Sequence, residues 1–275
     1  IVVVPSGFEG DMSLFKSKAE DVYRKMISYP MFSKDINSLN VVVSLNEPQN
    51  SSRNSFCKFN CADIDHLLCC DLPDANDLAD QCTTGARELL VIHNSTKFGG
   101  AGGAYASTSI HPESSKIAVH ELGHSIVGLA DEYDYGFATD SSPNCDVSGC
   151  YKWQDLIGSF GVNCKGKSCR NGLYYTSETT IMKSLGFPFG ELNEAIGCCA
   201  YFQHTGSFPP SLCGKFDSTK LNLNDFCNTI TKSDNSLVQL KEPFVYYFKK
   251  VSNLEWKLIK TIKSTQKYFY RTEIE

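Results

Sequence analysis

The chain has 275 residues, of which 21% are charged, and its formal net charge at pH 7 is −5. A chain of this length can bury a substantial core, either as one domain or as one domain with an appendage. The acidic balance and the lack of a basic run argue against a nucleic-acid partner. No apolar stretch reaches the roughly 20 residues that cross a bilayer, so we expect no membrane span.

Thirteen cysteines fall into three clusters, at 57–82, 145–169 and 198–227. This number is typical of disulfides formed in an oxidising compartment and predicts a secreted or extracellular protein. The alternative is structural zinc held by cysteine pairs, but the spacings do not repeat those of a zinc finger. An odd count leaves at least one thiol outside intrachain disulfides. The sequons at Asn50 and Asn94 fit a secreted glycoprotein.

Three runs of β-branched and aliphatic residues are typical of strands and lie at 1–4, 39–45 and 88–92. Between the first two, residues 11–27 place apolar side chains at helical spacing. A strand, a helix, a second strand and, after a connecting region, a third strand predict a layered α/β domain.

The connecting region begins with a polar, cysteine-bearing insertion at 47–61, and short helical pieces are expected around 63–68 and 75–83. The glycine-rich segment 98–105 lacks the strand-to-helix context and the lysine of a phosphate-binding loop, so no nucleotide cofactor is expected. Residues 102–110 are expected to form a loop and an edge strand to which a peptide substrate could add, or else a flexible surface loop.

The stretch His120-Glu-Leu-Gly-His124 has the spacing of a zinc site. On a helix, residues four apart lie about 40° apart around the axis and roughly 6 Å apart along it, so both imidazoles can face one ion. Glu121 is rotated about 100° from His120, where its carboxylate can reach a water on the ion. The spacing predicts two ligands and a base, whereas the alternative is an exposed amphipathic helix.

The residues that follow this motif offer a helix stop at Gly128 and a third, hard ligand at Asp131. An unbroken helix would carry Asp131 roughly 16 Å along the axis from His120, too far to share an ion. We therefore expect the helix to end near Gly128, where glycine can adopt a positive φ and let the chain turn back under the metal.

The second half of the chain has a less regular pattern. Residues 136–174 are rich in Gly, Ser, Asn and Cys and are expected to be an irregular region held by disulfides. A helix is expected at 191–200, and the tail from residue 238 carries short strand-like runs. We predict a catalytic domain over residues 1–215 and a small β-rich C-terminal appendage over residues 216–275.

The pattern from His120 through Gly128 and Asp131 to Tyr133 resembles the signature of the IgA-peptidase family of zinc metalloendopeptidases, which is similar to the metzincins. The resemblance implies a metzincin-like catalytic domain with a mixed sheet over the zinc-binding helix and a methionine-bearing turn, at Met182, below it. It also implies a secreted or surface endopeptidase that acts on protein or peptide substrates.

Carried over by position, the resemblance implies that His120, His124 and Asp131 bind one catalytic Zn²⁺ and that Glu121 is the catalytic base. The sequence departs from the metzincin spacing, in which the glycine comes one residue earlier and the third ligand is a histidine. This departure leaves Glu132 as a rival third ligand.

Three protein ligands leave a position for water, whose pKa zinc lowers to about 7. Glu121 would activate this zinc-bound water for hydrolysis of the peptide bond. A donor must also stabilise the oxyanion, and Tyr133, Tyr201 and His204 are the candidates. The remaining histidines have no partner at metal spacing and are expected to be structural: His66, His93 and His111.

We therefore expect a secreted zinc endopeptidase. The alternative is a catalytically inactive, peptidase-like binding or adhesion protein whose working surface is the cysteine-rich middle and the tail. The retained Glu121 argues against this alternative, because a catalytic base contributes little to a fold. A zinc esterase or amidase is disfavoured only by the resemblance.

Overall fold

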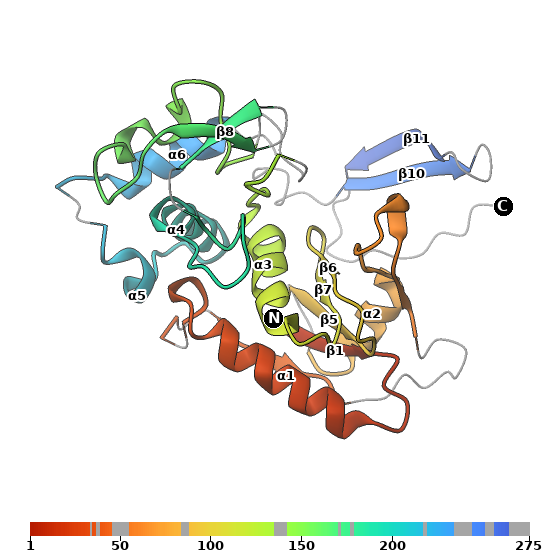
Figure 1. Ribbon diagram of the computed structural model, residues 1–275. Coiled ribbons are helices and arrows are strands. Elements are labelled where there is room, and N and C mark those ends of the chain that lie inside the picture. The colour runs from red at the N-terminus through yellow and green to blue at the C-terminus, as the bar shows by residue number, and fades with distance from the viewer. Residues whose placement is uncertain are drawn as a thin grey trace.

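The computed structural model of the protein describes residues 1–33, 35–36, 39–45, 55–83, 88–134, 142–169, 172–176, 179–216, 219–233, 244–250 and 256–263. These residues form a mixed α/β fold around a five-stranded sheet of order β2-β1-β5-β7-β6 (Figure 1). The strands of this sheet are β1 (Val2–Ser6), β2 (Val42–Val43), β5 (Leu89–His93), β6 (Gly100–Ala101) and β7 (Ala106–Thr108). Three of its pairings are parallel and the β6–β7 pairing is antiparallel, which confirms the predicted mixed sheet.

The central strands are covered on both faces. Val3 and Leu90 belong to the core that also holds α1 (Met12–Met26) and α3 (Ser114–Val127), whereas their neighbours Val2 and Val4 pack toward α2 (Leu72–Asp80). Successive side chains of a strand point to opposite faces, so a strand buried on both sides is apolar throughout. The continuous apolar runs of the sequence follow from this arrangement.

The first helix is confirmed close to its predicted bounds. The side chain of Asp11 accepts a hydrogen bond from the backbone N–H of Leu14 at 3.2 Å and caps the N-terminus of α1. Its buried side chains recur at helical spacing and face α3 and the sheet: Phe15, Ala19, Val22 and Met26. A short 3-10 turn, η1 (Pro30–Phe32), follows the helix.

The helical piece predicted at 63–68 is wrong. The chain there makes one 3-10 turn, η3 (Cys61–Asp63), and lies between the strands of a short hairpin, β3 (Cys57–Lys58) and β4 (Cys69–Cys70). Asp63 has φ of 60° and Ile64 is extended, with φ −106° and ψ 110°, which a right-handed helix cannot accommodate. The start of the predicted insertion, including the sequon at Asn50, lies outside the described residues, whereas Asn94 is exposed.

The second half adds helices and short hairpins to this core. Its elements are η4 (Tyr151–Leu156), β8 (Lys165–Cys169), β9 (Leu173–Tyr175), α4 (Glu191–Thr205), α5 (Pro210–Cys213), α6 (Leu223–Ser233), β10 (Phe244–Lys250) and β11 (Trp256–Lys263). The predicted helix at 191–200 is confirmed and extends to Thr205. Phe226 and Ile230 of α6 are buried in the same core as α1 and α3. Strands β10 and β11 pair antiparallel.

Six disulfides join twelve of the thirteen cysteines, as the clusters predicted. They are Cys57–Cys70, Cys61–Cys69, Cys145–Cys169, Cys150–Cys164, Cys198–Cys213 and Cys199–Cys227. These bonds rule out the alternative that the cysteine pairs hold structural zinc, and they indicate an extracellular or secreted protein. Within the described part of the chain, none of the helices has the length and apolar character to cross a membrane.

Candidate metal centre

Helix α3 carries His120 and His124 and ends where the sequence predicted. Gly128 adopts φ 75° and ψ 19°, and its N–H donates to the carbonyl oxygen of His124 at 3.0 Å. The next N–H, of Leu129, donates back to Gly123 at 3.2 Å. This left-handed termination reverses the chain and satisfies the last carbonyl groups of the helix. The segment after Gly128 is thereby directed back toward the two histidines.

Asp131 on this returning segment meets both imidazoles. Its Oδ1 lies 3.2 Å from Nε2 of His120 and 3.3 Å from Nε2 of His124. The two Nε2 atoms are 3.0 Å apart. One ligand atom from each of the three residues therefore lies within 4.8 Å of the others, and the side chains are largely buried.

The hydrogen bonds of the two imidazoles fix which nitrogen carries the proton. Nδ1 of His120 lies 2.9 Å from the carbonyl oxygen of Ile181, and Nδ1 of His124 lies 2.6 Å from that of Leu129. A carbonyl oxygen only accepts, so each Nδ1 must donate. In the neutral rings both Nε2 atoms then present lone pairs toward each other and toward the carboxylate. Such outer hydrogen bonds are characteristic of metal-binding histidines.

This donor set fits a zinc ion. Zinc bonds of about 2.0–2.2 Å in tetrahedral geometry place ligand atoms roughly 3.3–3.6 Å apart. The three observed separations, 3.0, 3.2 and 3.3 Å, are close to that range. Burial would raise the pKa of Asp131, but the two histidines beside it hold it well below its usual range. The residues thus offer an ionised carboxylate beside two imidazole nitrogens.

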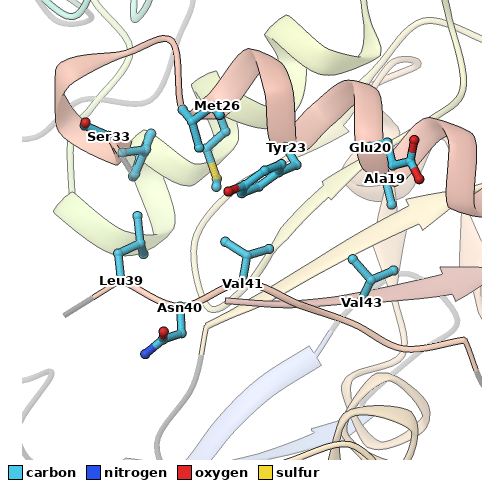
Figure 2. Close-up of a pocket in the computed structure, with 11 residues that line it drawn as sticks. Ala19, Glu20, Tyr23, Met26, Ser33, Leu39, Asn40, Val41 and Val43 are labelled. Atoms are coloured by element: carbon cyan, nitrogen blue, oxygen red, sulfur yellow. The ribbon is translucent and has the colours of Figure 1, made fainter. Parts of the chain in front are cut away.

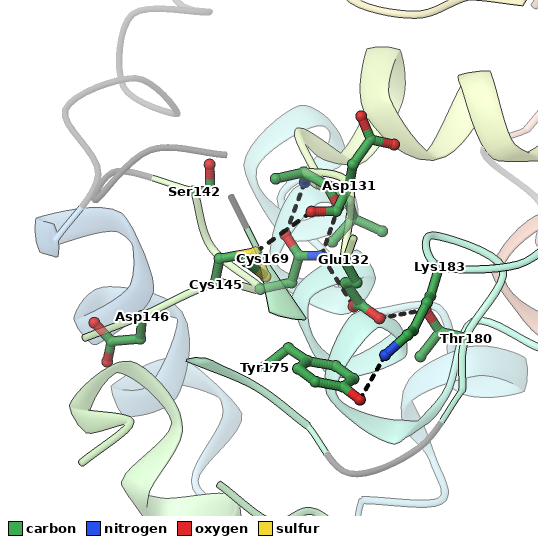
Figure 3. The surroundings of a disulfide bond; sticks show 12 residues. Asp131, Glu132, Ser142, Cys145, Asp146, Cys169, Tyr175, Thr180 and Lys183 are labelled. Atoms are coloured by element: carbon green, nitrogen blue, oxygen red, sulfur yellow. Dashed lines mark hydrogen bonds between the residues drawn. A yellow bond between two sulfur atoms is a disulfide. The ribbon is translucent and has the colours of Figure 1, made fainter. Parts of the chain in front are cut away.

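The carboxylate of Glu132, the rival third ligand, points toward Thr180 (Figure 3). Its carboxylate is fully buried and accepts hydrogen bonds from Thr180 Oγ1 at 2.5 Å, Asn193 Nδ2 at 2.9 Å and Asn144 Nδ2 at 3.0 Å. Asn144 also makes two hydrogen bonds with the backbone of Ala130. Glu132 therefore ties the returning segment to α4, to the turn at Thr180 and to the region of the Cys145–Cys169 disulfide.

Met182 lies directly beneath α3. A Cβ added to Gly123 would come within 2.9 Å of its sulfur, so the absence of a side chain at Gly123 makes room for the methionine. The backbone carbonyl of Met182 accepts a hydrogen bond from the N–H of Glu132 at 2.9 Å. The preceding carbonyl, of Ile181, holds His120. The turn around Met182 thus contacts the helix, a histidine and the returning segment.

Glu121 faces the edge of the sheet. A Cβ added to Gly100 would lie 3.0 Å from its Oε1, and one added to Gly102 would lie 2.9 Å from its Oε2. Burial raises the pKa of Glu121, while the nearby charges of His120 and His124 oppose that rise. The carboxylate therefore lies beside both the histidines and the outermost strand of the sheet.

The three expected oxyanion donors have different surroundings. Tyr133 follows Asp131 and Glu132 and is partly exposed. Tyr201 is buried, and its hydroxyl donates to the carbonyl oxygen of Met31 at 2.9 Å, in η1. His204 is exposed near the C-terminal end of α4, about 16 Å along the helix axis from Asn193. Of the three, Tyr133 alone lies within two residues of Asp131 in the chain.

Several residues around the site carried no signal in the sequence. Asn144, Thr180 and Asn193 hold Glu132, yet none belongs to the zinc motif. Of the two glycines against Glu121, Gly102 lies in the segment 102–110 that was expected to be a loop with an edge strand or a flexible surface loop, whereas Gly100 precedes that segment. A close backbone contact of this kind has no spacing by which a single sequence reveals it.

A separate cavity of about 400 Å³ lies between α1 and the chain around β2 (Figure 2). Tyr23 and Met26 of α1 face Leu39 and Val41 across it. Strand β2 is at the opposite edge of the sheet from β6, and none of the lining residues is a candidate site residue. This cavity is therefore separate from Glu121 and the histidines.

The comparison with protein families gives a match to the family described as IgA Peptidase M64 over residues 16–157, more than half of the chain. The matched range includes most of α1, the sheet strands from β2 to β7, α3 and the returning segment with Asp131. No curated protein matches the chain.

Proposed function

Because this chain belongs to the IgA peptidase family M64, we propose that it is a zinc-dependent endopeptidase that hydrolyses peptide bonds in protein substrates. The observation that carries the proposal is the convergence of His120, His124 and Asp131, with the carboxylate of Glu121 beside them. Membership alone supports a peptidase, and these four side chains supply the chemistry that a zinc peptidase needs.

His120 Nε2, His124 Nε2 and a carboxylate oxygen of Asp131 would hold the ion. When bound, zinc supplies a Lewis acid that polarises the scissile carbonyl and lowers the pKa of a water to about 7. The carbonyl oxygens of Ile181 and Leu129 keep both rings in the binding tautomer. The carboxylate of Glu132 accepts a hydrogen bond from Thr180, and its backbone N–H donates to the carbonyl oxygen of Met182. Glu132 would thereby hold the neighbouring Asp131 in place relative to the Met182 turn.

Glu121 acts as the base and then as the acid. Its carboxylate accepts a proton from the attacking water and passes this proton to the nitrogen of the departing amine, so that the charge of the residue is restored after one turnover. The raised pKa that burial gives this carboxyl suits the first step, because the conjugate base of a weaker acid accepts a proton more readily. The phenol of Tyr133 is our choice as donor to the oxyanion.

The layering of the fold and the extent of the catalytic domain are part of the proposal. We propose a metzincin-like layering, with the mixed sheet over α3 and the Met182 turn below it, and a secreted enzyme. The disulfide Cys199–Cys227 and the burial of Phe226 join α6 to α4 and the main core. We therefore place the end of the catalytic domain after α6 and not at residue 215, with the C-terminal appendage beginning beyond residue 233.

Chelation distinguishes this function from an inactive binding protein. Wild-type protein is expected to cleave members of a diverse peptide library, to lose this activity when zinc is removed by a chelator, and to regain it when zinc is returned. An inactive peptidase-like scaffold would cleave nothing in any of the three states. A zinc esterase would hydrolyse ester substrates in a chelator-sensitive manner and leave the peptides intact.

A further inference from the structure

Strand β6 forms one edge of the sheet and pairs with β7 through Gly100↔Thr108 and Ala101↔Ser107. An edge strand presents backbone N–H and C=O groups to which an extended peptide can add. Glu121 lies beside this strand, because a Cβ on Gly100 would come within 3.0 Å of its Oε1. A peptide extended along β6 would therefore pass the proposed base.

The chain itself fills part of this edge. Leu67 forms a parallel bridge with Gly100, and the N–H of Leu68 donates to the carbonyl oxygen of Gly100 at 3.1 Å. The two backbone segments are also in close contact at Gly99, where an added Cβ would lie 1.9 Å from the carbonyl oxygen of His66. Residues 66–68 thus occupy the position in which a substrate backbone would pair with Gly100.

These residues belong to the Cys61–Cys69 loop, by which we mean residues 61–69, closed by the disulfide between its two ends. A second disulfide, Cys57–Cys70, links the strands just outside the loop. The hydroxyl of Ser107 in β7 donates to the carbonyl oxygen of Leu68 at 2.7 Å, and Leu68 is fully buried. The loop is therefore attached firmly to the edge of the sheet.

The tip of the loop is exposed next to the base. Asp63, Asp65 and His66 all have exposed side chains, and Asp65 is held by Lys97 Nζ at 2.6 Å. The carbonyl oxygen of His66 lies against Gly99, the residue before the Gly100 that is next to the Glu121 carboxylate. His66, expected from the sequence to be structural, is thus available to a peptide bound at the site.

We propose that the Cys61–Cys69 loop is a specificity element of the peptidase, which stops backbone pairing of the substrate at Gly100 and sets His66 against the residues on one side of the scissile bond. This inference rests on the proposed function. The ligand is an extended peptide that pairs with the strand from Ala101 onward and meets loop side chains beyond Gly100.

The direction of β6 determines which side of the scissile bond meets the Cys61–Cys69 loop. Gly100 lies beside Ile117 and Glu121, and Gly102 lies beside Glu121 and His124, so the strand runs in the same sense as α3. A peptide paired antiparallel with β6 runs in the opposite sense, from Gly102 toward Gly100. Its residues C-terminal to the cut therefore meet the loop, and its residues N-terminal to the cut pair with the open part of the strand.

A positional-scanning peptide library tests the inference with two variants. His66→Ala removes one exposed side chain, and Cys61→Ser with Cys69→Ser opens the loop. Lys16→Ala, on the exposed side of α1, is the control for the first, and Cys150→Ser with Cys164→Ser is the control for loss of a disulfide elsewhere. Cleavage, zinc content and the unfolding midpoint are measured for all five proteins.

We expect His66→Ala to change the preference among residues C-terminal to the cut by about three- to tenfold, with a larger change in the open-loop variant. The preferences for residues N-terminal to the cut should stay as in the wild type in both variants. The two control proteins should keep the wild-type preferences on both sides of the cut. Unchanged preferences in His66→Ala, or equal changes on both sides, would overturn the inference. If the open-loop variant does not fold, His66→Ala decides alone. A wild type that cleaves nothing refutes the peptidase itself, whereas cleavage with unaltered selectivity refutes only the role of the loop.

Discussion

Nε2 of His120 lies 3.0 Å from Nε2 of His124, although the other nitrogen of each ring already donates to a backbone carbonyl. Two lone pairs at this distance repel each other unless a cation lies between them. The ionised carboxylate of Asp131, within 3.3 Å of both nitrogens, adds negative charge at the same point. The fold thus brings together three electron-pair donor groups, and a metal ion bound among them would relieve their mutual repulsion.

Asp131 should be the third ligand, and replacing it should weaken metal binding more than replacing its neighbour. We expect Asp131→Ala to raise the dissociation constant for zinc by at least about 100-fold, because one of three protein ligands is lost. Glu132→Ala should weaken binding by about 10–100-fold at most, as changes to supporting residues do. Competition with a chromophoric chelator measures both constants, and the exposed Asp134→Ala serves as control. A larger loss in Glu132→Ala would show that Glu132 binds the ion.

Glu132 should contribute strongly to stability. Glu132→Gln keeps the shape of the side chain but turns an amide N–H₂ toward donors from Thr180, Asn193 and Asn144, which leaves one of them unsatisfied in a buried place. We expect a loss of about 2–4 kcal/mol in the free energy of unfolding. Urea titration of the metal-free protein measures it, with the exposed Glu20→Gln on α1 as the matched control. Equal midpoints for the two variants would contradict the role of these hydrogen bonds.

The sequence predicted those parts of the site whose residues lie close together in the chain. His120, Glu121 and His124 share one helix face, and Gly128 followed by Asp131 gave the point of chain reversal. The hydrogen bonds of Glu132 come from residues 12, 48 and 61 positions away, and no periodicity relates such distant polar residues. The helix expected at 63–68 failed for a related reason, because positive φ angles within a disulfide-closed loop overrode local propensity.

Gly102 should be required for the position of the base. An added Cβ would come within 2.6 Å of the backbone oxygen of Glu121 and 2.7 Å of His124 Cβ, and neither atom can move without displacing α3. Gly102→Ala should therefore push β6 away from the helix and lower kcat/KM by about tenfold or more, as small misplacements of reacting groups do. Zinc content should remain at one ion per chain, since no ligand is altered. A variant with wild-type kinetics would show that the close contact has no catalytic consequence.

Glu88 should make stability depend on pH. Burial raises the pKa of Glu88 to about 7 from 4.5. A carboxyl with a raised folded-state pKa stabilises the fold below pH 4.5, and this contribution disappears as the pH rises through 7. The shift corresponds to about 3 kcal/mol. Glu88→Gln cannot ionise, so the difference in unfolding free energy between the variant and the wild type should grow in favour of the variant between pH 5 and pH 8. A constant difference over this range would contradict the assignment.

The direct test of the peptidase proposal compares wild type with Glu121→Gln, which keeps the size of the side chain and removes its basicity. Zinc per chain is measured by elemental analysis, and peptide cleavage is measured on the same samples, with Glu20→Gln as control. We expect about one zinc ion in all three proteins and a rate of cleavage at least about 100-fold lower in Glu121→Gln alone. Undiminished cleavage by Glu121→Gln, or a wild type that holds no zinc and shows no chelator-sensitive cleavage, would contradict the account.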